Sequence, residues 1–398
     1  MKVAVVGAGA AGMLASISAR EAGAEVVALE QHARVGKKLL ATGNGRCNVM
    51  NAGAVDGRYN GDGAGVAASM VGSAGARRLI SYFEGIGLLL REEGERRVYP
   101  ASGTANAVVD ALRFRMDRVG VSVLCGWAVG SIRRERAGFT LNSLGGESIR
   151  ADRVIVATGG RAGIAGTDAL GYELLARLGH PITSPRPALA PIRVAADSIR
   201  GLKGVRALAS LALMDGERQI RAESGEIIFS DNSISGIPIM QCSRYISGGA
   251  NWLRIDLLPE REAGAWRAWL EARAADDGHA NAEALLRGLV HPRVALCLLR
   301  AAGAGADVRA ADAPWRAIAR LLRDWRIPVL GTADFSRAQV TAGGASLSAF
   351  NPDTLESKLI PGLFAAGEAL DVDGDCGGFN LMWAWASGIT VGTHIAKQ

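Results

Sequence analysis

Cysteine, histidine and aromatic residues are scarce in this 398-residue chain. The five cysteines are odd in number and form no C-x-x-C pair, which argues against a disulfide framework and for a reducing cytoplasm. The five histidines are scattered, so we expect no zinc or other metal site. Because no apolar run reaches the ~18 residues of a membrane-spanning helix, we expect a cytoplasmic protein without a membrane span.

The charge balance is basic, with a formal net charge of +6 and a pI of about 9.3. A basic balance can indicate a nucleic-acid partner. Here the arginines are dispersed and aromatic residues make up only 5% of the chain, so we expect a solvated arginine-rich surface and no nucleic-acid partner. The length allows a large core divided among two or three domains.

The N-terminal segment has the pattern of a dinucleotide-binding unit. Val3–Val6 is a short apolar run suited to a buried parallel strand, and Gly7, Gly9 and Gly12 follow in G-x-G-x-x-G spacing. In this motif the first glycine makes a tight turn, the second admits a pyrophosphate, and the third lets the helix pack on the strand. We predict a helix over 10–22 whose N-terminus faces the phosphates.

A second predicted strand, Glu25–Glu30, ends in an acid. The Glu30 carboxylate can accept hydrogen bonds from both ribose hydroxyls and would repel a 2′-phosphate, so we do not expect NADP at this position. A lone G-x-G-x-x-G is a weak signal, but strand, helix and acid together make a chance glycine cluster the weaker alternative. The contacts predicted for this unit are Gly7, Ala8, Gly9, Ala10, Ala11, Gly12, Glu30 and Gln31.

A second glycine-rich segment lies near the other end of the chain. We predict a strand over 362–366 and a helix over 381–395, entered through a glycine pair. Backbone N–H groups at that helix start would point at the flavin N1–C2=O edge, where negative charge builds on reduction, and Glu368 could hold the ribityl chain. One dinucleotide site built from both ends of a chain is typical of FAD proteins. The contacts predicted here are Gly367, Glu368, Gly377, Gly378, Phe379, Asn380 and Leu381.

The segments between the two ends supply further candidates. We predict a long loop over 35–51 whose basic residues suit a pyrophosphate, although an ordinary solvated loop would contain the same residues. Val129 lies where a small meander could offer its backbone to the adenine edge, and a plain core valine is an equal alternative. The contacts predicted here are Lys37, Lys38, Leu39, Thr42, Gly43, Arg46, Cys47, Asn48, Val129, Ala157, Thr158 and Gly159.

Other patterns indicate an α/β fold with an insert. Helices are predicted over 77–87 and 104–119, an antiparallel meander of four strands over 121–150, and a buried parallel strand over 152–160. Four prolines between Pro181 and Pro191 indicate a domain crossing. Short strands are then predicted to about residue 225, helices over 260–323, and a return to strand and loop near residue 340.

Two other site types have partial matches in the sequence. Asp371, Asp373 and Asp375 repeat the D-x-D-x-D of an EF-hand loop, but Cys376 and Met382 stand where that loop needs Gly and Glu, so we exclude calcium. Cys47 and Cys376 both lie in motifs expected near the cofactor. A redox pair is conceivable, but two thiols that merely pack are the stronger alternative.

Several motifs together resemble the BaiN/RdsA-type family of NAD(P)/FAD-dependent oxidoreductases over essentially the whole chain. The resemblance rests on GAGAAG (7–12), GKKLLATGNGRCN (36–48), ATGG (157–160), GYELLARLGH (171–180), TAGGASL (341–347), ESKLIPGLFAAGE (356–368) and DVDGDCGGFNLMWAWASG (371–388). It implies a discontinuous Rossmann-like FAD-binding domain with an inserted β-barrel-like domain that carries a helical subdomain. The implied boundaries are 1–187 and 336–398 for the FAD domain, 188–258 and 324–335 for the barrel, and 259–323 for the helices.

One stretch departs from the family pattern. The segment 225–241 resembles one that usually carries a Thr-His pair and a Ser-Gly-Pro turn. Here Ser230 and Asp231 replace the pair, and Ile237 separates Gly236 from Pro238. If this segment faces the substrate, the specificity implied by the family does not carry over.

The resemblance implies a reductase of a small-molecule substrate. FAD would stay bound, NADH or NADPH would bind transiently and deliver hydride, and the acceptor would be organic, such as a conjugated double bond. No catalytic acid is identified; Tyr99, Tyr172 and Asp231 are candidates only because they can donate a proton. The alternatives are a tRNA-modifying flavoprotein and a flavin-binding protein without turnover. No oligomeric state is indicated.

Overall fold

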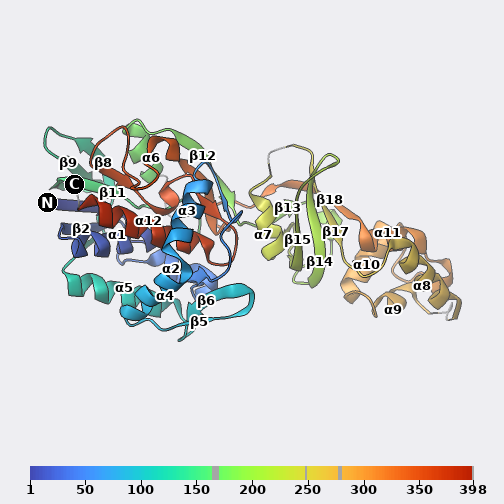
Figure 1. Cartoon of the computed structure of the whole chain (residues 1–398). Coiled ribbons are helices and arrows are strands. Elements are labelled where there is room, and N and C mark those ends of the chain that lie inside the picture. The colour runs from blue at the N-terminus through green and yellow to red at the C-terminus, as the bar shows by residue number, and fades with distance from the viewer. Residues whose placement is uncertain (164–169, 247–248, 277–279, 397–398) are drawn as a thin grey trace. The chain divides into compact units, whose positions relative to one another are not determined.

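The computed structural model describes residues 1–163, 170–246, 249–276 and 280–396 (Figure 1). The chain folds into two compact units. The first unit combines Met1–Arg186 with Gln339–Gln398, and the second is Pro187–Ala338. The first unit is therefore built from both ends of the chain. None of the described helices is long and apolar enough to cross a membrane.

A parallel sheet forms the centre of the first unit. Five of the described strands run in the order β20-β11-β1-β2-β7. Their bounds are Leu363–Ala365 for β20, Arg153–Val156 for β11, Lys2–Val6 for β1, Glu25–Glu30 for β2 and Ser122–Cys125 for β7. The predicted FAD-type topology, in which a C-terminal strand joins the N-terminal sheet, is confirmed. The apolar residues of β1 and β11 are buried, as expected of central parallel strands.

Helices α1 (Ala10–Glu21) and α12 (Phe379–Ile395) pack closely against each other beside this sheet (Figure 1). A Cβ at Gly388 or Gly392 of α12 would lie 2.5 Å from a carbonyl oxygen of α1, so glycine permits the contact. The oxygens belong to Ala11 and, four residues on, Ala15, so the two helices run parallel. Small residues at this spacing let helix backbones approach each other.

The parallel packing staggers the two helix N-termini. The α12 helix begins nine residues before Gly388, whereas α1 begins one residue before Ala11, which lies opposite Gly388. At 1.5 Å of rise per residue, α12 starts roughly 12 Å beyond the start of α1. Two helix N-termini are thus held at a fixed separation by one helix contact.

Smaller elements surround this core. Helices α2, α3, α4, α5 and α6 cover Lys37–Ala41, Ala64–Ala74, Ala76–Gly85, Ala105–Val119 and Leu170–Arg177. Strands β8, β9 and β10, at Val129–Arg134, Phe139–Ser143 and Ser148–Ala151, form an antiparallel sheet, and β5, β6 and β3, at Leu90–Glu92, Arg97–Pro100 and Met50–Asn51, form another. Two pairs complete the unit: β12 (Ile182–Ala188) with β19 (Val340–Ala345), and β4 (Tyr59–Asn60) with β21 (Asp373–Gly374).

Two local predictions were wrong. The strand predicted at 121–124 is β7, and it pairs in parallel with β2 rather than joining the meander. The segment 35–51 is not one long loop, because it contains α2, a 3₁₀ turn at Thr42–Gly45 and β3. Leu39 is 2% exposed, and burying this side chain favours the short helix.

The second unit is a closed barrel with appended helices. Six described strands close in the order β13-β16-β15-β14-β17-β18, at Ile192–Val194, Ser233–Ser235, Arg218–Phe229, Arg206–Asp215, Asn251–Asp256 and Trp325–Thr332. Helix α7 is Ile237–Ser243, and α8, α9, α10 and α11 cover Ala263–Asp276, Ala282–Leu286, Pro292–Ala301 and Trp315–Arg323. The barrel and its helices share one buried apolar core. The expected inserted barrel with a helical part is confirmed, although β14 and β15 are longer than the short strands predicted there.

Candidate functional site

The glycine turn between β1 and α1 leaves one face open. Gly7 has φ +95°, and a Cβ there would lie 2.6 Å from the carbonyl oxygen of Ala157. A Cβ at Gly12 would lie 1.8 Å from the carbonyl oxygen of Gly7, so both glycines are required by packing. A Cβ at Gly9, in contrast, meets no atom within 4 Å in the described chain. The turn therefore has room for a ligand at Gly9, as the dinucleotide motif predicts.

The N-terminus of α1 opens at this face. Gly9 is the N-cap, and within the described residues no side chain caps it. The N–H groups of the first helical turn have no partner within an α-helix, so those of Ala10, Ala11 and Gly12 suit an anion. The backbone of Ala157 is tied to β1 through Val6, which places the ATGG motif at the same edge of the sheet.

Glu30 fixes the glycine turn to the end of β2. The side chain is 7% exposed, and its two oxygens accept hydrogen bonds of 2.9 Å from the backbone N–H groups of Ala8 and His32. Gln31 extends toward the His32 ring, with 3.4 Å between Nε2 atoms. Each carboxylate oxygen has a second lone pair, so Glu30 can still accept a ribose hydroxyl.

The end of β2 is also tied to the segment that leads into β8. The backbone N–H of Trp127 donates to the carbonyl oxygen of Glu30, and that of Gly126 to His32, at 2.9 Å each. Val129 begins β8, which is an edge strand of its sheet, and its side chain is 5% exposed. The valine side chain therefore belongs to the core. Because β8 is an edge strand, the Val129 backbone can still contact the adenine, and that contact stays a prediction.

In the segment 37–48, Arg46, Thr42 and Gly43 contact other parts of the protein. Arg46 is exposed; it pairs with Glu93, and its guanidinium lies 4.3 Å from the Tyr99 ring centroid. Thr42 turns its hydroxyl to the Leu39 carbonyl oxygen at 2.6 Å. Gly43 is needed for packing, since a Cβ there would lie 2.9 Å from the backbone nitrogen of Asn48.

Cys47 is fully buried in a left-handed conformation with φ +58°. Burial raises the pKa of its thiol to about 11, so the thiol stays protonated at neutral pH. Within the described residues, Cys47 and Cys376 are not joined by a disulfide. A protonated buried thiol is a poor nucleophile, which weighs against the redox alternative.

Two predicted contacts carry buried polar atoms that the described chain does not satisfy. These are Oδ1 of Asn48 and Oγ1 of Thr158. A buried polar atom without a partner is costly, so each would gain from a polar ligand. Thr158 is also packed by Gly171, where a Cβ would lie 1.9 Å from its hydroxyl oxygen. The orphaned atoms fit a site that receives a polar cofactor.

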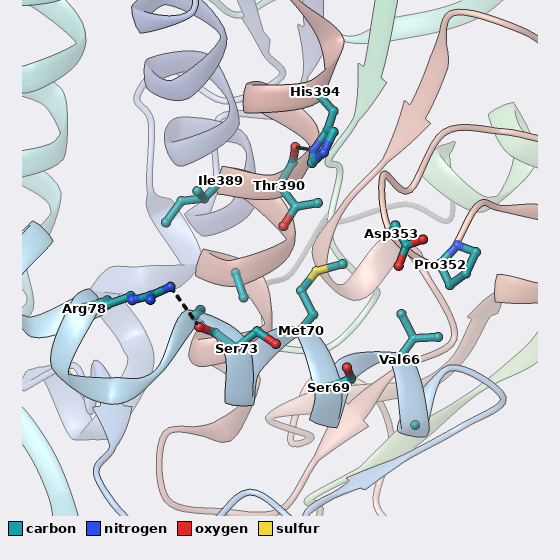
Figure 2. Close-up of a pocket in the computed structure, with 13 residues that line it drawn as sticks. Val66, Ser69, Met70, Ser73, Arg78, Pro352, Asp353, Ile389, Thr390 and His394 are labelled. Carbon is teal, nitrogen blue, oxygen red and sulfur yellow. Dashed lines mark hydrogen bonds between the residues drawn. The ribbon is translucent and has the colours of Figure 1, made fainter. Parts of the chain in front are cut away.

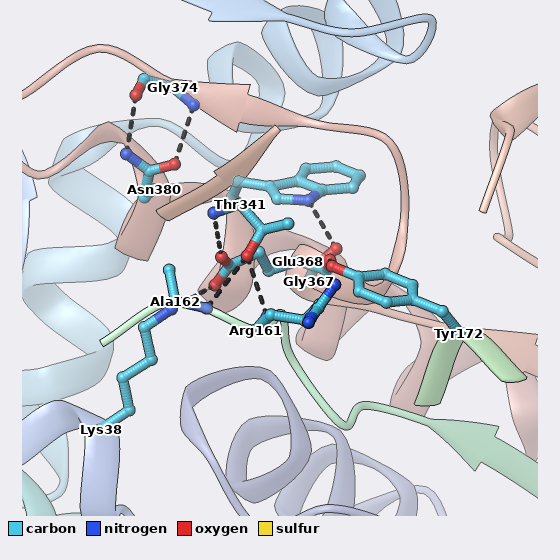
Figure 3. Close-up of polar contacts among 10 residues, drawn as sticks. Lys38, Arg161, Ala162, Tyr172, Thr341, Gly367, Glu368, Gly374 and Asn380 are labelled. Carbon is cyan, nitrogen blue, oxygen red and sulfur yellow. Dashed lines mark hydrogen bonds and ion pairs between the residues drawn. The ribbon is translucent and has the colours of Figure 1, made fainter. Parts of the chain in front are cut away.

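Glu368 collects contacts from several motifs (Figure 3). Its Oε2 lies 2.6 Å from Nζ of Lys38, and its Oε1 accepts a 2.6 Å hydrogen bond from the Thr341 backbone N–H. A Cβ at Gly160 would lie 2.6 Å from Oε1, so glycine makes room for the carboxylate. The Tyr172 hydroxyl donates to the Glu368 carbonyl oxygen at 3.1 Å.

Thr341 and its neighbours complete this network. The Thr341 hydroxyl oxygen accepts hydrogen bonds from the backbone N–H groups of Arg161 and Ala162 at 2.9 and 3.1 Å (Figure 3). Beside Glu368, the Gly367 N–H donates to the Ser387 hydroxyl at 2.9 Å, and the Trp383 indole donates to the Gly367 carbonyl oxygen at 3.0 Å. Thr341 and Ser387 were not predicted as site residues. They lie in the TAGG and WAWASG motifs, to which the sequence alone assigned no function.

The start of α12 is shaped by its neighbours in the fold. Gly378 is the N-cap with φ +101°, and a Cβ there would lie 2.5 Å from the backbone of Met50. Asn380 bonds the N–H and the carbonyl oxygen of Gly374, at 2.8 Å each, and Asn51 donates to the Gly377 carbonyl oxygen at 3.0 Å. A larger residue at position 378 would clash with this backbone, so the missing side chain makes room for β3.

The three candidate acids have different surroundings. Tyr99 lies under Arg46 on the surface side. Tyr172 is buried, and burial together with the nearby Glu368 charge raises the pKa of its phenol well above its usual range. Asp231 is exposed in the second unit, 2.6 Å from Nζ of Lys203. Asp371, Asp373 and Asp375 are buried, and no group of metal-ligating side chains occurs among the described residues.

A separate pocket lies between α3, the C-terminal half of α12 and the turn at Pro352–Asp353 (Figure 2). Its volume is about 540 Å³. Met70 of α3 and Thr390 and His394 of α12 line it (Figure 2). None of the predicted cofactor contacts lines this pocket, so it is distinct from the candidate site.

Comparison with known proteins places the chain in a family. It matches the family described as HI0933-like protein Rossmann domain over residues 1–394. The chain belongs to this family. The resemblance found from the motifs is thereby confirmed, and the family match spans both units.

Similar proteins span nearly the whole chain. A Clostridium scindens protein named 3-dehydro-bile acid delta(4,6)-reductase is 33% identical over 408 residues, which cover 100% of this chain and 99% of that protein. An Escherichia coli protein named ribosomal RNA dihydrouridine synthase is 28% identical over 396 residues, or 96% and 95% of the two chains. The solved 3-ketosteroid-delta4-(5alpha)-dehydrogenase of Rhodococcus jostii RHA1 is 17% identical, with a TM-score of 0.51 and coverage of 100% and 96%. This last likeness shows a shared fold.

Proposed function

We propose that this protein is an FAD-dependent oxidoreductase that reduces a carbon–carbon double bond conjugated with a carbonyl group. The observation that carries the proposal is the pair of parallel helices α1 and α12, whose N-termini lack a side-chain cap within the described chain and start roughly 12 Å apart along their common direction. An extended cofactor with an anionic middle and an electron-accepting end suits two such helix starts.

The residues present fit FAD from end to end. Glu30 and the edge of β8 would hold the adenosine, and the N–H groups after Gly9 would hold the pyrophosphate. Glu368 would face the ribityl chain, and the first turn of α12 would face the flavin ring. When bound, FAD supplies hydride acceptance and donation, and the α12 N-terminus would stabilise negative charge on the reduced ring.

The names of two relatives support the acceptor class. A 3-dehydro group conjugated with delta(4,6) double bonds, as in the name of the Clostridium scindens relative, is an extended enone. Dihydrouridine, as in the name of the Escherichia coli relative, is uridine whose C5=C6 bond has been reduced, and that bond is conjugated with a carbonyl. Both names describe reduction of a double bond polarised by a carbonyl, so we infer the same chemistry for this chain, with NADH or NADPH as the donor.

An anaerobic assay tests this proposal. The purified protein should release FAD on denaturation, and NADH or NADPH should bleach the absorbance of the bound oxidised flavin. A 3-oxo-Δ4 or 3-oxo-Δ4,6 steroid added next should restore that absorbance, with a saturated 3-oxo steroid as the control that does not. A protein that binds no FAD, or whose reduced flavin is oxidised by neither steroid nor RNA, would contradict the proposal.

A uracil base in RNA is the second candidate acceptor, and the 28% identity to the Escherichia coli relative over nearly the whole chain favours it. The absence of a nucleic-acid partner therefore stays a prediction. Incubating the reduced protein with unmodified ribosomal RNA and measuring dihydrouridine by mass spectrometry distinguishes the two acceptors. Turnover with RNA alone would assign the base, and turnover with the steroid alone would assign a small enone.

A further inference from the structure

The two neighbouring lysines of the GKK motif have different surroundings. Both are basic residues of the kind that suits a pyrophosphate. In the structure, Lys37 lies near the His32 ring, with 3.5 Å between Nζ and Nδ1. Lys38 instead forms an ion pair with Glu368, 2.6 Å from Nζ to Oε2 (Figure 3). The second lysine thus bridges 330 residues of sequence to a carboxylate near the C-terminus.

The Glu368 carboxylate is held on both oxygens. Lys38 binds Oε2, the Thr341 backbone N–H binds Oε1, and Gly160 backs Oε1 closely. The side chains of Lys38 and Glu368 are only 29% and 18% exposed. Removing the lysine from such a partly buried pair leaves an uncompensated charge and a carboxylate free to rotate on one side.

Contact with a phosphate would require Lys38 to leave this pair. The departure would expose Glu368 as an unpaired anion next to an anionic cofactor, and like charges repel. Retaining the pair keeps Glu368 oriented, with its second lone pairs available to hydroxyl groups. We therefore expect the pair to persist when the cofactor is bound.

We propose that Lys38 is a positioning residue that acts through Glu368 on the ribityl and flavin part of the cofactor, and that it is not a pyrophosphate ligand. This inference rests on the proposed FAD site. It assigns Lys38 to the flavin half of the cofactor, whereas its motif alone predicts the phosphate half.

Three ligands separate these halves: FAD, riboflavin, which lacks phosphates, and ADP, which lacks the flavin. Calorimetry on the full-length apoprotein gives the dissociation constants for wild type, Lys38→Met, Glu368→Gln and the double variant. We expect Lys38→Met to weaken FAD and riboflavin alike by about tenfold, and to leave ADP within about twofold. The double variant should bind FAD no more weakly than Glu368→Gln alone, because the two residues act as one unit.

Two controls keep the test specific. Lys37→Met removes the same charge one residue away and should leave riboflavin binding unchanged. Lys38→Arg keeps a charged donor to Glu368 and should restore most of the riboflavin affinity, and melting curves of each apoprotein identify any variant that fails to fold. If Lys38→Met is unfolded, the affinities of Lys38→Arg and Glu368→Gln for FAD, riboflavin and ADP are compared instead, and they test the same assignment.

Two outcomes would overturn the inference. The first is a loss of ADP and FAD affinity by the same factor with riboflavin unchanged, which would make Lys38 a phosphate ligand. The second is additive losses in the double variant, which would make the two residues independent. A wild-type protein that binds ADP and neither flavin would instead contradict the proposed function, and the inference would fall with it.

Discussion

The imidazole Nε2 of His180 lies 2.7 Å from the hydroxyl oxygen of Ser357, and both side chains are buried. The other ring nitrogen, Nδ1, faces the Leu175 carbonyl oxygen at 3.2 Å, and the ring stacks on Phe350 with centroids 4.9 Å apart. The Ser357 hydroxyl oxygen also accepts backbone N–H groups of the following turn. A neutral ring with Nδ1–H as donor and Nε2 as acceptor satisfies every partner, so this pair joins two family motifs in the neutral state of the histidine.

This pair predicts a pH-dependent stability. Burial lowers the pKa of His180 below its usual range. As the pH falls below about 6.5, the histidine of the unfolded chain takes up a proton before the buried His180 does. The stability that neutral His180 contributes is therefore present above pH 6.5 and is lost as the pH falls through the lower pKa of the folded state. The free energy of unfolding by urea should therefore fall more between pH 7 and pH 5 for wild type than for His180→Gln. The half-buried His394→Ala is the control, and an equal slope in wild type and His180→Gln would contradict the account.

Glu30→Gln should affect both the cofactor and the apoprotein. The amide keeps one acceptor and turns an NH2 group toward a backbone N–H of Ala8 or His32. Losing charged hydrogen bonds of ~1.5–3 kcal/mol should weaken FAD binding roughly ten- to a hundredfold. The apoprotein should also melt at a lower temperature, because a buried donor then faces another donor. Glu25→Gln, at the exposed start of the same strand, should change neither quantity strongly; an unchanged FAD affinity in Glu30→Gln would mean that the ribose is held elsewhere.

Gly9→Ala should weaken FAD binding and spare the fold. Its added Cβ meets no atom within 4 Å in the described part of the chain, and φ at Gly9 is −81°, which alanine adopts readily. The melting temperature of the apoprotein should drop by no more than a few degrees, since replacing an N-cap glycine with alanine costs ~1 kcal/mol or less. Titration with FAD should show at least a tenfold loss of affinity. Wild-type FAD affinity in this variant would argue against a pyrophosphate at the α1 N-terminus.

Gly378→Ala, unlike Gly9→Ala, should lower the stability of the apoprotein. Its Cβ would lie 2.5 Å from the backbone of Met50, at a φ of +101° that alanine rarely adopts. Backbone strain of this kind costs of order 1–3 kcal/mol, which lowers a melting temperature by roughly 2–10 °C in a domain of this size. Calorimetric melting of the apoprotein, compared with Gly9→Ala, measures the difference. A Gly378→Ala apoprotein as stable as wild type would show that β3 can move away.

The sequence predicted most of what depends on local pattern. The strand Glu25–Glu30 has the predicted bounds, and α1 starts at the predicted residue, because two buried apolar runs, a glycine turn and a helix stop all lie within thirty residues. The pairing of Ser122–Cys125 with β2 was missed, because a strand's partner is chosen by tertiary packing that its own residues do not encode.

The residues of the candidate site also differ in how far the sequence predicted them. Gly7, Gly9 and Gly12 were assigned by spacing, and the structure separates the two that serve packing from the one that faces open space. The Lys38–Glu368 pair was not foreseen as a pair, although both residues were candidates, because one sequence contains no signal for two charges so far apart in the chain. Arg46 was assigned to the pyrophosphate by its motif; in the structure it pairs with Glu93, and its contact with the cofactor stays a prediction.

The division of the first unit between both ends of the chain determines the order in which the protein can assemble during synthesis. Helix α1 leaves the ribosome early, but Gly388 and Gly392, which receive it, belong to the last helix described. The second unit, Pro187–Ala338, is complete before either glycine is made. The N-terminal segment therefore still lacks its packing against α12 when the whole second unit has already been synthesised. A stop codon ahead of Phe379 would leave that segment without its partner helix for the lifetime of the protein.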